Sequence, residues 1–174
     1  MRVSLVLVGR TIPAFTRIVE AIRKEFRAEA DLEFMDFPMT RSFRSGRQQY
    51  DADVLLDEIG RFFSPGEKTI FVVREDIFSA PLNFVFGLAR GDAAIVSTAR
   101  LDPRFYGPVE DNALANALFK DRILKEIMHE LGHTLGLPHC DDKKCVMVFS
   151  DSIAGVDYKG ADFCAKCKKA MYLE

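Results

Sequence analysis

The stretch HELGHTLGLPH, from His129 to His139, is the most informative part of this chain. Residues four apart lie on one face of a helix, so His129 and His133 can present two imidazole nitrogens to one cation. Gly136 follows one turn later, where a glycine can adopt the left-handed conformation that ends a helix. That turn can bring His139 back to the same cation. Three imidazoles with one position left for water are typical of a catalytic zinc site.

Glu130 adjoins the two helical histidines without being a natural third ligand. Zinc would lower the pKa of water at this site toward about 7, and Glu130 could take the proton and later pass it to a leaving amine. A bare match of this kind can also arise by chance on a charged helix. The third histidine stands in register, and the chain has no histidine besides these three, which favours the functional interpretation.

The surrounding residues predict a long helix from residue 112 to about residue 135. At about 100° per residue, the histidines and Glu130 lie opposite an apolar stripe, so the helix can pack with one face and bind a metal with the other. The stripe consists of Leu124, Ile127, Met128, Leu131 and Leu135. Glu126 falls on the metal face one turn before Glu130, where it could orient an imidazole. A lone glutamate is more often solvated, and we expect that here.

The first 110 residues predict a mixed layer of strands and helices. Residues 2–9 are β-branched and apolar at nearly every position, which is typical of a central strand covered on both faces. Further strands are expected at residues 32–37, 69–73, 83–88 and 93–98. Amphipathic helices are expected from Pro13 to Phe26 and over residues 54–62, the second one closed by Pro65-Gly66. We expect loops at residues 41–50 and 103–108.

The overall composition indicates one folded domain, residues 1–174, without a membrane segment. Apolar residues make up 48% and charged residues 29%, which excludes a disordered chain. The formal charge of −2 gives no support to a nucleic-acid partner. No run approaches the roughly eighteen apolar residues of a membrane span, and residues 2–9 are too short for a signal peptide, so we expect a cytoplasmic protein. The sequence does not determine the oligomeric state, and a monomer is the slightly favoured state. We expect five phenylalanines in the core: Phe62, Phe63, Phe84, Phe86 and Phe105.

All four cysteines lie in the last part of the chain. Cys140 and Cys145 form one pair, and Cys164 and Cys167 form a CxxC pair, which together supply the four thiolates of a tetrahedral structural zinc site. Buried free thiols and a redox CxxC are the alternatives. A redox pair is expected at a strand-to-helix junction, which is not evident here. Because residues 137–174 have little periodicity and little core of their own, we favour a structural zinc.

A zinc ribbon that binds nucleic acid is the sharper alternative for this segment. Four lysines surround the second cysteine pair: Lys159, Lys166, Lys168 and Lys169. Five aspartates lie in the same segment: Asp141, Asp142, Asp151, Asp157 and Asp162. The mixture favours a solvated surface, so we expect no nucleic-acid partner.

The motif, extended to His139 and followed by Met147, resembles the metzincin clan of zinc peptidases, whose members carry HExxHxxGxxH and then a methionine turn beneath the metal. The added cysteines resemble more narrowly the archaemetzincin family. This resemblance implies a catalytic zinc at the three histidines and a second zinc at Cys140, Cys145, Cys164 and Cys167. Many metzincins place a tyrosine two residues after the turn methionine, and this chain has Phe149 there, so that helper is missing.

The resemblance also implies the fold, a mixed α/β metzincin-like architecture. It has a twisted, mixed five-stranded sheet with backing helices. Residues 1–136 would form an upper subdomain that includes the active-site helix, and residues 137–174 a small, irregular, cysteine-rich lower subdomain. The edge strand beside the cleft would come from residues 83–98 and could bind an extended peptide by strand addition. Either β-run in that region could be the edge.

The predicted function is therefore hydrolysis of peptide bonds by a zinc peptidase with Glu130 as general base and two zinc ions per chain. Both an endopeptidase and an aminopeptidase fit the residues. The alternative is a zinc-binding protein of restricted or no peptidase activity, which would act as a peptide-binding or regulatory module.

Overall fold

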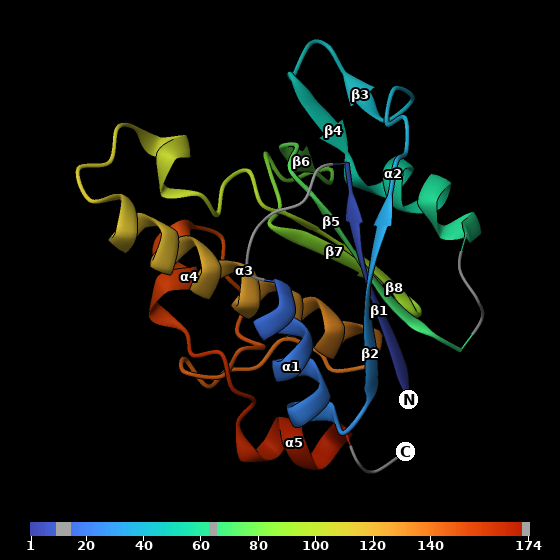
Figure 1. Cartoon of the computed structure of the whole chain (residues 1–174), viewed down its shortest axis with the longest axis vertical. Coiled ribbons are helices and arrows are strands. Elements are labelled where there is room, and N and C mark those ends of the chain that lie inside the picture. The colour runs from blue at the N-terminus through green and yellow to red at the C-terminus, as the bar shows by residue number, and fades with distance from the viewer. Residues whose placement is uncertain (10–14, 63–65, 172–174) are drawn as a thin grey trace.

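The computed structural model describes residues 1–9, 15–62 and 66–171, and its centre is a twisted five-stranded sheet (Figure 1). The strand order is β2-β1-β5-β8-β7, in which the first four strands run parallel and β7 is antiparallel to β8. The bounds are Arg2–Val8 for β1, Glu29–Met35 for β2, Lys68–Val73 for β5, Gly87–Arg90 for β7 and Ala93–Ser97 for β8. The predicted mixed sheet is confirmed.

The central strands are apolar because helices cover both faces of the sheet. In β1, Val3, Leu5 and Leu7 pack into one buried cluster with helix α1 (Phe15–Phe26), whereas Val6 and Val8 pack into a second cluster. That second cluster includes helix α2 (Ala52–Ile59) on the opposite side of the sheet. Alternate residues of a strand point to opposite faces, so a strand that is covered on both faces is apolar at nearly every position.

The two predicted helices of this region are present. The large apolar residues of α1 are all buried, although the predicted start at Pro13 lies outside the described residues. Helix α2 begins at Ala52, two residues before the predicted start, because the Asp51 side chain caps it by accepting from the backbone amide of Val54. A 3₁₀ turn, η1 (Gly60–Phe62), follows, and the predicted closure at Pro65 lies outside the described residues.

Several predicted boundaries are wrong. Residues 41–50 are not only a loop, because β3 (Phe43–Arg44) and β4 (Gln49–Asp51) form a small second sheet with β6 (Ile77–Phe78). Strands of two or three residues are too short to leave a periodic pattern. The predicted strand at residues 83–88 lies later, as β7, while β2 begins and ends earlier than predicted. Residues 103–108 contain a 3₁₀ turn, η2 (Pro103–Tyr106).

The C-terminal segment packs more extensively than predicted. It contains the short helices α4 (Ile153–Tyr158) and α5 (Ala165–Met171). Val146, Met147, Val156 and Phe163 are buried in the same cluster as α1. The Phe163 ring lies edge-on to Phe26, with centroids 5.5 Å apart. The α1 residues that share this core lie far away in the sequence, so the shared core is visible only in the fold, and the division at residue 136 stays a prediction.

The predicted burial of aromatic residues is confirmed for Phe86 alone. Phe86 is buried and Phe84 is half-buried, but Phe62 and Phe105 are 64% and 46% exposed. The exposed pair contact other aromatic rings instead, Phe62 with Phe37 and Phe105 with Tyr106. Phe63 lies outside the described residues. Among the described residues, no helix has the length and apolar character needed to cross a bilayer.

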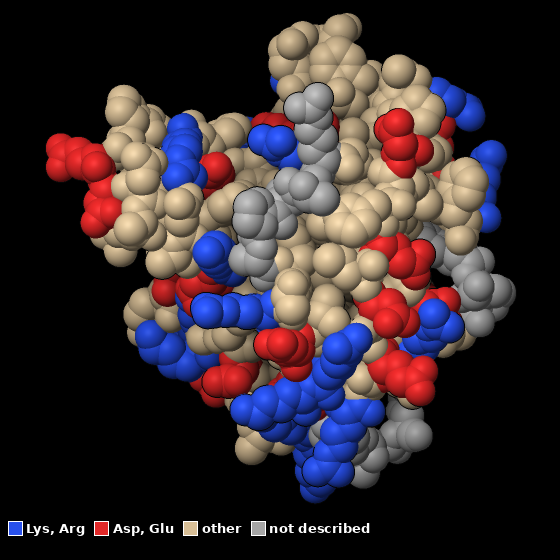
Figure 2. Space-filling view, viewed as in Figure 1, with Lys and Arg blue, Asp and Glu red and all other residues tan. Residues whose placement is uncertain are grey.

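Charged side chains of both signs are interspersed over much of the visible face in Figure 2. Basic side chains are concentrated at its lower end, where α5 lies in Figure 1. Lys168 of α5 forms an ion pair of 2.8 Å with Glu25 of α1. This contact joins the C-terminal helix to the helix that covers the sheet.

Candidate metal centres

Helix α3 (Asn112–Thr134) carries the histidine motif beneath the sheet. The Asp111 side chain caps its first turn by accepting from the amides of Ala113 and Leu114. The helix ends as predicted, because Gly136 has a φ of 80° and turns the chain back. The apolar stripe packs against the sheet, with Ile127 and Leu131 fully buried.

The three histidines converge on one point. Their ligand atoms all lie within 4.8 Å of one another, and the Nε2 atoms of His129 and His133 are 3.1 Å apart. His129 is buried and His133 half-buried, whereas His139 lies on the exposed side against the Phe149 ring, with centroids 5.1 Å apart. Sequence spacing and the turn at Gly136 together account for this arrangement.

The hydrogen bonds of the two helical histidines show what the site can bind. Nδ1 of His129 donates to the carbonyl of Val146 at 2.8 Å, and Nδ1 of His133 donates to the carbonyl of Leu137 at 2.7 Å. Both Nε2 atoms then carry lone pairs, and two lone pairs facing each other repel unless a cation lies between them. A tetrahedral zinc with bonds of about 2.0–2.1 Å separates its nitrogen ligands by roughly 3.3 Å. The donor set therefore fits zinc.

Burial keeps these imidazoles neutral. It lowers the pKa of His133 and His139, and it lowers the pKa of His129 well below its usual value, with the nearby Lys159 ammonium adding to the effect. Only a neutral imidazole can bind a metal. The site is therefore ready to bind a cation at neutral pH.

The Glu130 carboxyl group lies beside the histidines and is almost fully buried. Its exposed fraction is 4%, and Oε2 has no hydrogen-bond partner among the described residues. Burial raises the pKa of Glu130 well above its usual range, and the neighbouring Glu126 raises it further. A buried carboxyl group without a partner is costly in a folded protein, which is typical of a group retained for chemistry.

This burial predicts a pH dependence of the metal-free protein. Because the folded state raises the pKa of Glu130, it retains a proton that the unfolded chain has lost, so stability falls as the pH rises from about 4 through the raised pKa. Glu130→Gln removes this loss. We expect the metal-free variant to melt at a higher temperature than the metal-free parent near neutral pH and at the same temperature below about pH 4. Melting temperatures can be measured by circular dichroism. The same difference in melting temperature between variant and parent at both pH values would contradict this prediction.

The expectation that Glu126 is solvated is wrong. Its side chain is 3% exposed and forms an ion pair of 2.8 Å with Lys159, whose Nζ also lies 3.5 Å from Nδ1 of His129. Lys159 is buried too, at 2%. The sequence missed Lys159 because its partner lies 33 residues away, and a lysine near other charges is typical of a surface. The ion pair joins the segment after α4 to the active-site helix.

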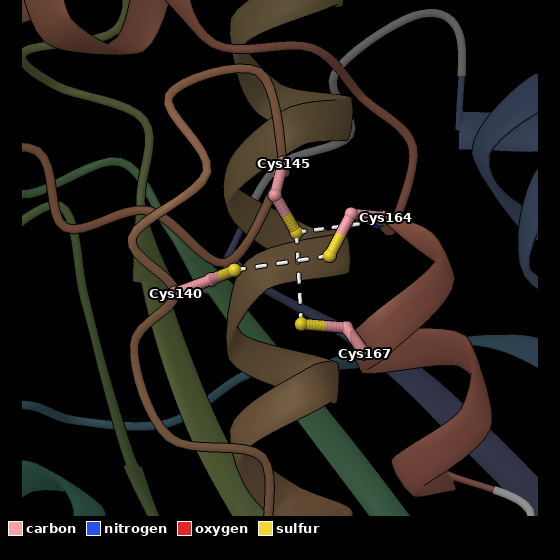
Figure 3. Close-up of side chains that lie close together, drawn as sticks. All are labelled: Cys140, Cys145, Cys164 and Cys167. Carbon is pink, nitrogen blue, oxygen red and sulfur yellow. Dashed lines mark hydrogen bonds between the residues drawn. The ribbon is translucent and has the colours of Figure 1, made fainter.

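The four cysteine sulfur atoms also converge on one point (Figure 3). Sγ of Cys140 lies 3.8 Å from that of Cys164, and Sγ of Cys145 lies 3.7 Å from that of Cys167. Zinc–sulfur bonds of about 2.3 Å in a tetrahedron separate the sulfurs by roughly 3.8 Å, whereas a disulfide requires about 2.05 Å. The backbone amide of Cys167 lowers the pKa of the Cys164 thiol to about 7, whereas burial raises the pKa of Cys145 and of Cys167, so those two thiols would lose their protons only on binding a metal. The cluster fits zinc.

Met147 lies directly beneath the motif helix. It is fully buried, and a methyl group added to Gly132 would overlap its Sδ atom. Gly132 therefore lets the helix lie on the methionine between His129 and His133. The carbonyl of Met147 accepts from the amide of Cys140 at 2.9 Å, which links this methionine to the cysteine cluster.

A cavity of about 610 Å³ opens over the histidines and Glu130. One wall is the segment from residue 79 to residue 89, and the opposite wall includes Phe149, Ser150 and Asp151. Strand β7 is the last strand of the sheet, so it is the edge that borders the cavity. Residues 83–86, predicted as strand, instead form cavity wall.

Two histidines on a helix and a third beyond its end, converging below the edge strand of a mixed sheet, are typical of the class of zinc metallopeptidases. The family model for Peptidase family M54 matches residues 10–172. The archaemetzincin of Halobacterium salinarum is 36% identical over 176 residues, which cover 99% of this chain and 100% of that protein. The archaemetzincin of Sulfolobus acidocaldarius is 46% identical over 131 residues, 74% of this chain and 72% of that protein.

Solved structures of archaemetzincins are similar to this chain over nearly its whole length. The archaemetzincin of Methanopyrus kandleri has a TM-score of 0.83 at 34% identity, with 98% of this chain and 93% of that chain covered. The archaemetzincin of Archaeoglobus fulgidus, solved with malonate, has a TM-score of 0.79 at 30% identity, with 98% and 99% covered. The chain therefore belongs to the archaemetzincin family of zinc metallopeptidases, and the resemblance drawn from its sequence is confirmed.

Proposed function

We propose that His129, His133 and His139 hold the catalytic zinc of this peptidase and that Glu130 is its general base. The observation that carries the proposal is that the Nε2 atoms of His129 and His133 lie 3.1 Å apart, with their lone pairs facing each other, beside the buried carboxyl group of Glu130. Zinc at this position would polarise the scissile carbonyl and lower the pKa of water. The alternative of a zinc-binding protein without peptidase activity is not favoured, because the chain belongs to a peptidase family.

The residues of the chain supply the remaining steps. A peptide in extended form lies along the free edge of β7 and adds a strand to the sheet, which places its backbone over Glu130. Glu130 accepts a proton from the attacking water and returns it to the leaving amine. Burial raises the pKa of Glu130 in the metal-free protein, and a zinc ion held by the neighbouring histidines would favour the carboxylate form that accepts the proton. Phe149 lies against His139 and offers no hydrogen-bond donor to the developing oxyanion.

We further propose that Cys140, Cys145, Cys164 and Cys167 hold a second, structural zinc. The supporting observation is the agreement of the two Sγ separations, 3.8 Å and 3.7 Å, with the edges of a zinc–thiolate tetrahedron. This zinc would join the loop after α3 to α5 and so hold Met147 below the motif helix. The predictions of a cytoplasmic location, of a monomer and of no nucleic-acid partner stay predictions.

Removal of the metal tests the peptidase proposal. We expect the zinc-loaded protein to cleave members of a library of internally quenched peptides and aminoacyl fluorogenic amides. A chelator should reduce this cleavage to background, and added zinc should restore it, because the histidines alone supply no group that polarises the carbonyl. Cleavage that persists at full rate in the chelated protein would contradict the proposal.

A further inference from the structure

Gly87, the first residue of β7, lies directly against the Glu130 side chain. A methyl group built on Gly87 would overlap Oε1 of Glu130 and would stand 2.6 Å from its Cγ and 2.7 Å from its Cδ. Its backbone does not account for the glycine, because Gly87 does not have the positive φ of Gly66, Gly91 or Gly136. The space in front of Gly87 is therefore taken by the carboxyl group.

The backbones of β7 and α3 are both held in place and cannot easily move away from each other. Gly87 pairs with Val96 of the buried strand β8, and the carbonyl of Phe86 accepts from the amide of Ser97 at 2.8 Å. On the other side, Ile127 and Leu131 of α3 flank Glu130 and are fully buried in the main core. A side chain at position 87 would thus displace the Glu130 carboxyl group, the softest part of the contact.

We propose that Gly87 is a positioning residue for the general base, because its missing side chain leaves the space in which the Glu130 carboxyl group lies. This inference rests on the proposed role of Glu130. It joins two functions of the edge strand, since the strand that would bind the peptide backbone also sets the location of the base. Gly87 itself takes no part in the chemistry.

The first test is a double-mutant cycle on peptide hydrolysis. A displacement of about 1 Å costs about 100-fold in rate, so Gly87→Ala should lower kcat about 100-fold, change KM by less than about 3-fold and leave the zinc content unchanged. Glu130→Ala removes Cγ, Cδ and the carboxyl oxygens from the contact, so adding Gly87→Ala to Glu130→Ala should change the residual kcat by less than about 3-fold. Gly46→Ala is the matched control, because an added methyl group there meets open space. If Gly87→Ala lowered kcat by the same factor with and without the Glu130 side chain, the inference would be overturned.

The second test measures packing without activity. Gly87→Ala should lower the melting temperature, and Glu130→Ala should restore it in the double variant, because the methyl group then enters the space that the carboxyl group leaves. The double variant should fold and melt near the temperature of Glu130→Ala even if Gly87→Ala alone fails to fold. Equal destabilisation by Gly87→Ala with and without the Glu130 side chain would overturn the inference.

The two tests separate this inference from the proposed function. Full turnover by Glu130→Ala would remove the role of the base, whereas an inactive Glu130→Ala beside a fully active Gly87→Ala would remove only the role of Gly87.

Discussion

Cys145→Ser is expected to remove one of the two zinc ions and to lower the melting temperature by more than about 10 °C. The Cys145 thiol is 1% exposed, lies 3.7 Å from the Cys167 sulfur and accepts from the amide of Cys164. A serine hydroxyl is a poor ligand for zinc, so the site should lose most of its affinity. Zinc in such sites contributes about 10–16 kcal/mol to the free energy of folding. A change of 1 kcal/mol shifts the melting temperature by about 2–4 °C in a protein of this size. A loss of several kcal/mol therefore gives the expected shift.

The metal-free protein provides the control for this prediction. After chelation, the parent and Cys145→Ser should differ only by the smaller cost of burying a hydroxyl group, about 1–3 kcal/mol. Zinc content by elemental analysis and melting temperature by calorimetry measure the effect. Two zinc ions per chain in the variant, with an unchanged melting temperature, would show that Cys145 is no ligand.

Glu130→Gln is expected to lower kcat/KM for peptide hydrolysis by about 10²–10⁴-fold. Glutamine has nearly the same shape as glutamate but cannot accept a proton, so the loss isolates the role of the base. The histidine site should retain its zinc, because Glu130 is not among the converging ligand atoms. Kinetics on the best peptide of the library, together with zinc analysis, measure both effects.

Glu110→Gln is the control for this variant. Glu110 is exposed just before the cap of α3 and lies far along the helix from the histidines, so its replacement should leave kcat/KM unchanged. Activity of Glu130→Gln within about 3-fold of the parent would assign the proton transfer to another group.

Local spacing was enough to predict which side chains converge in the histidine cluster and in the cysteine cluster. His129 and His133 share one helix face, Gly136 ends that helix with a positive φ, and the cysteines stand in two short pairs. Such relations extend over a few residues and follow from backbone geometry. The sheet was also predictable, because a strand covered on both faces, such as β1, is apolar at nearly every position.

Contacts between distant residues were not predictable in this way. The ion pair of Glu126 and Lys159 joins residues 33 apart, and each resembled a solvated surface residue by itself. The small sheet of β3, β4 and β6 depends on hydrogen bonds between distant segments and leaves no period in two- and three-residue strands. Gly87 had no distinguishing signal, since its importance comes from the Glu130 side chain that faces it.

Anomalous diffraction at the zinc absorption edge, from crystals of the protein grown with zinc, tests the central claim most directly. The account predicts two peaks per chain, one among the Nε2 atoms of His129, His133 and His139 and one among the four cysteine sulfurs. A map with zinc at the cysteines alone, or with the histidines directed away from a bound metal in the active protein, would contradict it.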